Sequence, residues 1–209
     1  MDPTFLALAI VILLFSVIIH EVAHGLAALY FGDHTAERAG RLTLNPIPHI
    51  DPIGTILLPL ALILTRSPLI FGWAKPVPVN PLNFSNIRKG ELVTSLAGIL
   101  SNLFLAFSAA LIFRLTGGFA SDTALSILKF TVDINLILGI FNLLPIPPLD
   151  GSKVVMSYLP YNLLKSYQQL ERYGIFIILL LYLIPVGNTS LLWFILGTVI
   201  GFFHSILGV

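Results

Sequence analysis

Two histidines and a glutamate stand at metal-binding spacing near the start of the chain. The sequence reads "HEVAH" from His20 through Glu21 to His24. Residues four positions apart lie on the same face of a helix, so the two imidazoles can bind one ion. Glu21 stands beside them and can take a proton from a water on that ion. The pattern predicts a zinc site with His20 and His24 as ligands and Glu21 as a base.

The same three residues lie inside a segment that is apolar enough to cross a membrane. Ionisable groups at membrane depth are expensive and need named partners. A zinc ion held by two histidines needs a third protein ligand and, for catalysis, a position open to water. The alternative is a polar cluster that packs helices together without a metal. A third ligand distinguishes the two interpretations.

Asp150 is the candidate third ligand. It follows the stretch "FNLLPIPPLDGSKV" of residues 141–154, in which three prolines stop a hydrophobic helix and Gly151 permits an unusual backbone angle. Non-helical backbone at membrane depth is tolerated only where it is buried in protein or lines a cavity. Two histidines and one carboxylate form a suitable zinc ligand set with an open position.

The composition indicates an integral membrane protein. Of the 209 residues, 56% are hydrophobic and 10% are charged, and the mean hydropathy is +0.95, whereas soluble domains carry about 25% charged residues. The 11 basic residues are spread along the chain, which gives no support to nucleic-acid binding. With no cysteine in the chain, a metal must be held by His, Asp or Glu.

We expect an all-α polytopic membrane protein of five to six transmembrane helices, with a short re-entrant or broken segment and a small extended or β element near the active site. A full span needs about 20 apolar residues. The expected segments, all in one domain of residues 1–209, are 4–31, 53–64, 92–114, 124–144, 173–184 and 190–208. Residues 53–64 are short and contain Pro59, which favours re-entry over a full crossing.

The basic residues predict the orientation in the membrane. With an outside N-terminus and five crossing segments, nine of the 11 basic residues fall on one side, which the positive-inside rule makes cytoplasmic. The nine are Arg38, Arg41, Arg66, Lys75, Arg88, Lys89, Lys153, Lys165 and Arg172. The first helix and the helix before Asp150 both end on this side. We therefore expect His20, His24 and Asp150 to meet in the cytoplasmic half.

Two segments near the expected site are typical of isolated extended chain. The loop of residues 66–91 is rich in proline and cannot be helical throughout. Its "PVPVN" portion at 76–80 and the earlier "GRLTL" at 40–44 suit an edge strand. Residues 160–172 mix aromatic, leucine and charged side chains, as an interfacial helix does.

The chain resembles the site-2 protease family of intramembrane zinc metalloproteases, peptidase family M50. The resemblance rests on "HEVAH" in the first segment and on "NLLPIPPLDG" at 142–151, which closes a later one. "GWAKPVPVNP" at 72–81 and "AGILSNL" at 97–103 are similar to the small prokaryotic branch that lacks PDZ and CBS domains. The resemblance covers nearly the whole chain.

This resemblance implies an enzyme that hydrolyses peptide bonds within or near the transmembrane segments of membrane proteins. His20, His24 and Asp150 would bind one zinc ion per chain, and Glu21 would be the catalytic base. The partners would be a transmembrane protein substrate and the lipid bilayer, with no nucleic acid, in a multi-pass protein of a prokaryotic cell membrane. A substrate unwound for cleavage could pair with "GRLTL" or "PVPVN" by strand addition. The oligomeric state stays open.

Two asparagines are further candidate members of the site. Asn142 matches the asparagine that opens the second motif, and its amide could hold the substrate backbone or polarise the scissile carbonyl. Gly98 and Asn102 match a small-x-x-x-polar pattern that could pack against the first helix and offer a hydrogen bond near the site. Close helix packing alone is the alternative for this pair.

The main alternative function is a membrane metal-binding protein or transporter that does not hydrolyse peptides. A transporter would carry ligands on several spans, whereas the candidates here form one cluster. Glu21 distinguishes the two, because three-ligand binding does not need it. We expect the remaining ionisable residues near or within the spans to be structural, with Asp133 capping or pairing with Arg114 or Lys129. These residues are His34, His49, Asp133 and His204.

Overall fold

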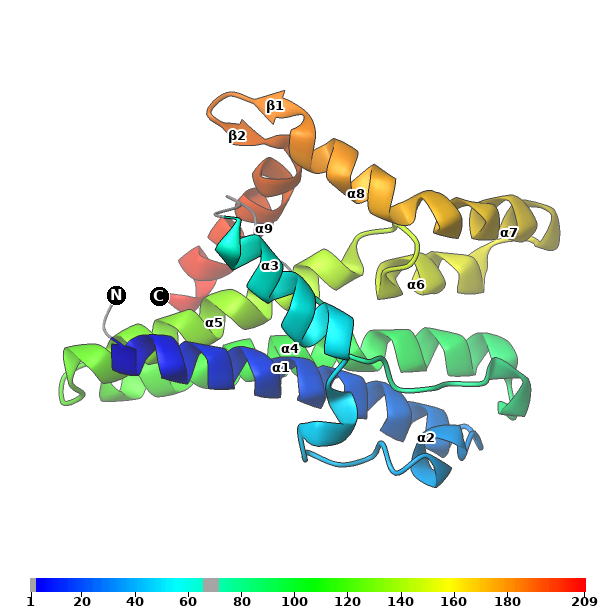
Figure 1. Ribbon diagram of the computed structural model, residues 1–209, viewed down its shortest axis with the longest axis horizontal. Coiled ribbons are helices and arrows are strands. Elements are labelled where there is room, and N and C mark those ends of the chain that lie inside the picture. The colour runs from blue at the N-terminus through cyan, green and yellow to red at the C-terminus, as the bar shows by residue number, and fades with distance from the viewer. Residues whose placement is uncertain (1–2, 66–71) are drawn as a thin grey trace.

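The computed structural model describes residues 3–65 and 72–209, and helices make up most of it (Figure 1). Single turns of 3-10 or π type are labelled η. In chain order the elements are α1 (Pro3–Tyr30), α2 (Thr35–Arg38), η1 (Ile47–His49), η2 (Pro52–Leu57), α3 (Leu58–Leu64), η3 (Pro81–Asn83), α4 (Ile87–Thr116), α5 (Asp122–Leu143), α6 (Asp150–Tyr158), α7 (Tyr161–Gln168), η4 (Gln169–Tyr173), α8 (Gly174–Leu183), β1 (Pro185–Val186), β2 (Thr189–Ser190) and α9 (Leu191–Leu207).

Within the described residues, three helices are long and apolar enough to cross a membrane, namely α1, α4 and α5. Two of them begin at a side-chain cap. Asn86 accepts a hydrogen bond from the backbone N–H of Lys89 at the start of α4, and Ser121 accepts one from Ala124 at the start of α5. Such caps satisfy N–H groups that have no partner inside the helix. The cap at Asn86 explains why α4 begins earlier than the predicted segment 92–114.

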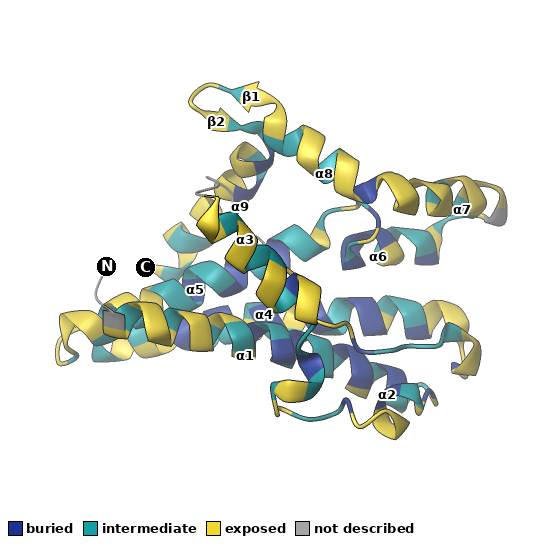
Figure 2. Ribbon diagram, in the orientation of Figure 1, coloured by how far each residue is buried: buried dark blue, intermediate teal, exposed yellow. Residues whose placement is uncertain are grey.

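The long helices pack through small side chains. One buried cluster joins α4, α5 and the first turns of α9, and its members are Ala106, Ala109, Ala110, Val132, Leu136, Ile140, Leu192 and Leu196. Alanine lets helix backbones approach closely, which matters in lipid because the hydrophobic effect does not hold helices together there. Figure 2 shows buried residues gathered where the helices face each other, with exposed residues on the outer surfaces.

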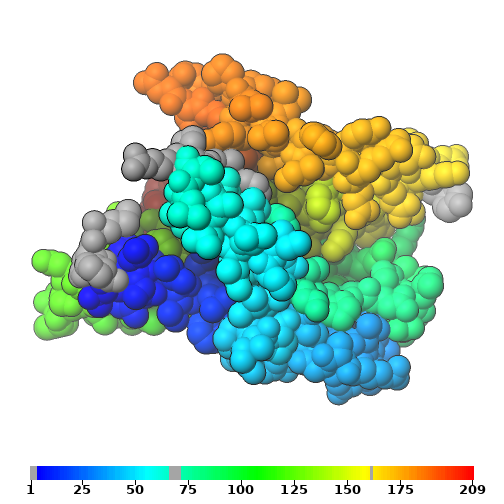
Figure 3. Space-filling view, in the orientation of Figure 1, coloured from blue at the N-terminus to red at the C-terminus, as the bar shows by residue number. Residues whose placement is uncertain are grey.

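Two further apolar helices are shorter than a full span: Pro52–Leu64, made of η2 and α3, and α9. A crossing of the roughly 30 Å hydrocarbon core needs about 20 helical residues, and α9 has 17. The segment 53–64 is therefore short, as expected, and the residues of α3 cover part of the front face (Figure 3). The lengths do not confirm five to six spans, and that number stays a prediction.

Helix α9 packs along α5, and α8 leads from the turn after α5 to the β1–β2 hairpin (Figure 1). Gly174, at the start of α8, packs against the proline-rich turn that follows α5. Towards the end of α9, the Nε2 atom of His204 lies 2.8 Å from Oδ1 of Asp133 on α5, and Gly208 lies next to Arg114 near the end of α4. Helix α8 thus starts beside the end of α5, and α9 finishes at the end of the bundle where α1 starts (Figure 1).

The extended elements differ in part from expectation. The one sheet among the described residues pairs Pro185 with Ser190 and Val186 with Thr189, and it connects α8 to α9 away from α1 (Figure 1). The expected extended segment near the site, residues 76–80, forms no strand and is irregular chain. Among the basic residues assigned to one side, Arg66 lies outside the described residues.

Candidate metal centre

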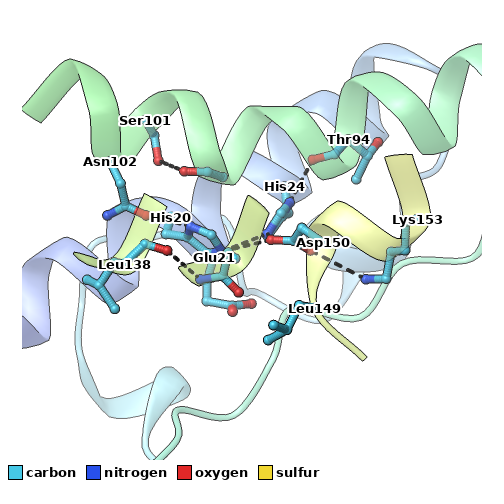
Figure 4. Close-up of polar contacts among 12 residues, drawn as sticks. His20, Glu21, His24, Thr94, Ser101, Asn102, Leu138, Leu149, Asp150 and Lys153 are labelled. Carbon is cyan, nitrogen blue, oxygen red and sulfur yellow. Dashed lines mark hydrogen bonds and ion pairs between the residues drawn. The ribbon is translucent and has the colours of Figure 1, made fainter. Parts of the chain in front are cut away.

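His20, His24 and Asp150 meet between α1 and the start of α6 (Figure 4). The Nε2 atoms of the two histidines are 3.0 Å apart. Oδ2 of Asp150 lies 3.2 Å from Nε2 of His20 and 3.1 Å from Nε2 of His24. All three residues are buried, with exposed fractions of 7%, 8% and 6%. Within the part of the chain that the structure describes, they form the one group of His, Asp and Glu side chains able to share a metal ion.

The other ring nitrogens fix which atoms face the centre of this group. Nδ1 of His24 lies 2.6 Å from the backbone carbonyl oxygen of Thr94. A carbonyl oxygen only accepts, so Nδ1 of His24 must carry a hydrogen and donate it. Nδ1 of His20 lies 2.7 Å from Oδ1 of Asn102 and donates in the same way. In the neutral rings, both Nε2 atoms therefore carry lone pairs.

Three electron-pair donors consequently converge on one buried point. Two lone pairs and a carboxylate oxygen repel one another unless a cation lies between them. Zinc bonds of about 2.0–2.1 Å at tetrahedral angles would place donor atoms about 3.3 Å apart, close to the 3.0–3.2 Å separations here. Histidine ligands of metals usually donate their second ring N–H to a carbonyl or amide oxygen. The donor set therefore fits one zinc ion.

The break after α5 delivers Asp150 to the histidines. Residues 144–149 are non-helical, and the Pro147–Pro148 peptide bond is cis. The backbone at Gly151 lies so close to the carbonyl groups of Leu143 and Leu144 that a side chain there would collide with them. This close approach requires glycine and sets the direction in which α6 starts. On the solvent side, Nζ of Lys153 lies 3.6 Å from Oδ1 of Asp150, so Oδ2 is the oxygen that faces the histidines.

Gly98 of α4 makes room for both imidazole rings. A Cβ atom at this position would lie 2.5 Å from Nε2 of His24 and 2.7 Å from Cε1 of His20. Atoms that are not bonded do not approach so closely, so only glycine allows α1 to lie this near α4. The small-x-x-x-polar pattern in the sequence therefore serves the site, since it places Gly98 against the rings and Asn102 on His20.

Glu21 is held by backbone rather than by a side chain. Its Oε2 atom accepts a hydrogen bond of 2.7 Å from the N–H of Val77. Val77 belongs to the irregular segment of residues 73–80, which we call the site segment. The sequence predicts extended chain near the site at residues 76–80 but does not identify Val77, because any residue except proline can supply a backbone N–H.

The site segment is attached to the rest of the protein on both sides of Val77. The N–H of Lys75 donates to the carbonyl of His49, and the Arg41 guanidinium donates to the carbonyl of Lys75 over 2.6 Å. At the other end, the N–H of Asn80 donates to Oδ2 of the buried Asp33 over 2.7 Å. Val77 is therefore presented to Glu21 by a chain segment with fixed ends.

The two predicted asparagines lie in different settings. Asn102 is fully buried, and its oxygen is occupied by His20. This geometry is better suited to holding the metal ligand His20 in place than to contacting a substrate. Asn142 lies in the last turn of α5, half-buried, and donates to the carbonyl of Leu138 over 2.9 Å. An amide nitrogen carries two hydrogens, so this bond uses only one N–H of Asn142.

The remaining ionisable residues have local partners. His34 pairs with Glu37 at the surface, and the Nε2 atom of His49 lies 2.9 Å from the carbonyl oxygen of Thr43. Asp133 pairs with His204 of α9. The sequence led us to expect Arg114 or Lys129 as the partner of Asp133, because the position of α9 along α5 was not foreseen.

Comparison with known proteins connects this geometry to a family. The sequence profile of peptidase family M50 matches residues 111–185. YwhC of Bacillus subtilis, which its name describes as a zinc metalloprotease, is 39% identical over 191 residues, covering 88% of this chain and 83% of YwhC. Rip2 of Mycolicibacterium smegmatis, also described by name as a zinc metalloprotease, is 30% identical over 184 residues, covering 87% of this chain and 67% of Rip2. No solved structure matches this chain.

Proposed function

This chain belongs to peptidase family M50 and is a zinc metalloprotease, and we propose that it hydrolyses peptide bonds within or next to the transmembrane segments of membrane proteins. One observation carries the proposal. His20, Glu21 and His24 lie inside α1, which is long and apolar enough to cross a membrane. A protease whose ligands lie within such a helix performs its chemistry at membrane depth, where the available peptide bonds are those of other membrane proteins.

The ligands of the one zinc ion would be His20, His24 and Asp150. When bound, zinc supplies a Lewis acid and lowers the pKa of a coordinated water. The hydrogen bonds to Thr94 and Asn102 keep the Nε2 lone pairs of both histidines directed at the point where the ion would be held. Thr94 and Asn102 would each orient one of the histidine ligands and would take no part in proton transfer.

Glu21 would act as the general base. The bond from Val77 occupies its Oε2 atom, so the other carboxylate oxygen is free to take the proton of the attacking water. The same oxygen would later return a proton to the leaving amine. The second N–H of Asn142 would donate to the substrate backbone or to the scissile carbonyl oxygen.

A substrate helix must unwind before it can be cut, because its carbonyl groups are engaged in its own hydrogen bonds. The site segment and the preceding residues 40–44 could offer backbone partners to the unwound chain by strand addition. We would abandon strand addition if proline at Thr43 and at Val79 left cleavage unchanged.

The protein is an integral membrane protein, and we propose that its active site lies in the cytoplasmic half of a prokaryotic cell membrane. The basic residues described on α2, on the first turn of α4, and on α6 and α7 lie at the end of the bundle where α1 finishes (Figure 1). Arg114, near the end of α4, lies at the other end. The positive-inside rule would make the first of these ends cytoplasmic.

The deciding experiment is Glu21→Gln, assayed against single-span membrane substrates in detergent and in bilayers, with zinc content measured on the same protein. We expect zinc to be retained and cleavage to fall by about 10²–10⁴-fold, the usual contribution of a general base. Glu37→Gln, on the exposed surface of α2, is the matched control and should cleave normally.

The same experiment separates the protease from a metal-binding protein or transporter. Normal cleavage by Glu21→Gln would exclude the proposed mechanism. Failure of the wild-type protein to cut any membrane substrate, together with loss of zinc in His20→Ala, would favour a metal-binding role instead. Soluble unfolded peptides serve as a further substrate class, and their exclusive cleavage would contradict a membrane substrate.

A further inference from the structure

A chain of buried hydrogen bonds continues behind His20 to a residue that the metal centre does not include. Nδ2 of Asn102 donates to Oδ1 of Asn135 over 2.9 Å and to the backbone carbonyl of Ser16 over 3.3 Å. Nδ2 of Asn135 donates in turn to Oγ of Ser16 and to the carbonyl of Thr131, both over 2.9 Å. Asn102 and Asn135 are each fully buried. This series of hydrogen bonds joins α1, α4 and α5.

Two backbone carbonyl groups fix the donor-to-acceptor order of these hydrogen bonds. The carbonyl of Thr131 can only accept, so the group of Asn135 that faces it must be the amide nitrogen, and its oxygen must face Asn102. The carbonyl of Ser16 imposes the same orientation on Asn102, whose oxygen is then left for His20. Because Oδ1 of Asn102 can only accept, Nδ1 of His20 must carry the hydrogen, and the lone pair of the neutral ring is then on Nε2.

We propose that Asn135 is a positioning residue for the metal ligand His20 and acts through the amide of Asn102. The proposal rests on the proposed function, because it takes His20 as a zinc ligand. Without the oxygen of Asn135, Asn102 keeps only the longer bond to Ser16. Its amide can then turn over and present N–H groups to the ring. His20 would then carry its hydrogen on Nε2, facing Asp150, and that form cannot bind zinc.

The effect to measure is zinc affinity, which does not depend on cleavage. Asn135→Ala in the full-length protein should bind zinc about tenfold more weakly in competition with a chelator, within the range typical of residues that hold a metal ligand. The spectrum of the cobalt-substituted protein should shift, because the donor set around the ion changes. Asn135→Ser is a milder second variant, since its short hydroxyl cannot reach Asn102, and it should behave in the same way.

Leu136→Ala is the matched control. Leu136 is the next residue of α5 and is fully buried in the apolar cluster, so its truncation destabilises the same helix without touching the hydrogen-bond chain. It should leave zinc affinity and the cobalt spectrum unchanged. An equal loss of affinity in Leu136→Ala and Asn135→Ala would overturn the proposal, because the effect would then be general loosening of the helices.

A double-mutant cycle tests the route through Asn102. If Asn135 acts through this amide, Asn135→Ala should lower affinity no further once Asn102 is alanine. Additive losses, or wild-type affinity in Asn135→Ala, would overturn the positioning role while leaving the protease intact. A wild-type protein that binds no zinc would instead overturn the proposed function itself.

Discussion

Gly98 is the position where one methyl group should separate an active metal centre from an inactive one. The Cβ of Gly98→Ala would lie 2.5 Å from Nε2 of His24, so either the ring or the whole of α1 must move. We expect zinc affinity and cleavage each to fall by about tenfold or more, since displaced ligands and misplaced catalytic groups have effects of this size. Chelator competition and single-turnover cleavage measure the two effects separately.

Gly139→Ala provides the control for Gly98→Ala. Gly139 is buried on α5, but a Cβ there would meet its nearest neighbour, a Leu103 methyl group, at 3.4 Å, an ordinary contact. It should retain zinc and cleavage. Wild-type behaviour of Gly98→Ala would show that the helices separate easily and that the close approach at Gly98 is not required.

At the residue scale, the side chains of the metal centre could be predicted from the sequence, but most of the groups that hold them in place could not. The spacing of His20, Glu21 and His24 and the helix break before Asp150 predicted the group of residues that the structure brings together. The backbone donor at Val77 could not be predicted, because every residue except proline carries an N–H. Asn135 could have been found from the sequence, because it is an amide inside an apolar helix. It also stands seven positions before Asn142, which places both asparagines on the same face of that helix.

The site segment is the element that holds the base. Val77→Pro removes the N–H that binds Glu21 and leaves the apolar character of the position. We expect cleavage to fall by about 10–100-fold, because a carboxylate that loses its anchor leaves the productive geometry, while zinc content should stay at the wild-type level. Single-turnover rates and metal analysis on the same preparation test this expectation.

Val77→Ala is the matched control, since it keeps the N–H and removes the buried methyl groups. It should retain most of the activity. If Val77→Ala were as inactive as Val77→Pro, the packing of the side chain against Gly25, and not the bond to Glu21, would be the important contact.

Hydrogen bonds to Asp33 join the end of α1 to the end of the site segment, and we call these contacts the clamp. Its buried carboxylate accepts hydrogen bonds from the hydroxyl and N–H of Thr35, the N–H of Asn80 and the side-chain amide of Asn83. An asparagine would offer one acceptor oxygen to these donors and turn its own N–H groups towards them. Asp33→Asn should therefore lower the free energy of unfolding by about 1–3 kcal/mol at neutral pH.

The clamp also predicts a pH dependence. Burial disfavours the charged form of Asp33, but the hydrogen bonds outweigh burial and hold the pKa of this carboxyl below its usual range. A lowered folded-state pKa stabilises the protein above the unfolded value of about 3.9 and loses this effect as pH falls through the folded value. The difference in melting temperature between the wild type and Asp33→Asn should be constant from about pH 5 to 8 and should narrow below about pH 4. A constant difference throughout would contradict the lowered pKa, because it would mean that folding leaves the pKa of Asp33 unchanged.

At the element scale, length and hydropathy predicted the long helices, and local chemistry decided the rest. The segments 4–31, 92–114 and 124–144 appear as α1, α4 and α5, since long apolar runs have few alternatives in lipid. The residues 76–80 have prolines that suit extended chain but do not form a strand. Strands need a partner, and partners are set by the tertiary fold.

At the scale of the whole molecule, the path of the last two helices predicts fewer crossings than a count of the hydropathic segments does. Counting hydropathic segments treats 173–184 and 190–208 as separate spans that run in opposite directions. In the structure, α8 starts by the proline-rich turn after α5 and α9 ends by Arg114, so together they cover the length of α5 once. Hydropathy reports how apolar a segment is, but it contains no information on where the next one begins.

This arrangement predicts that the end of α9 lies on the same side of the membrane as the turn between α4 and α5. The chain contains no cysteine, so each introduced thiol is the sole target for a membrane-impermeant maleimide. Gly118→Cys, in that turn, and a cysteine placed directly after Val209 should be labelled in intact cells, because both would be outside. Lys165→Cys, on α7, should react only after the membrane is opened. Five full crossings would instead place the thiol after Val209 with Lys165, so its protection in intact cells would show that α8 and α9 each cross the membrane.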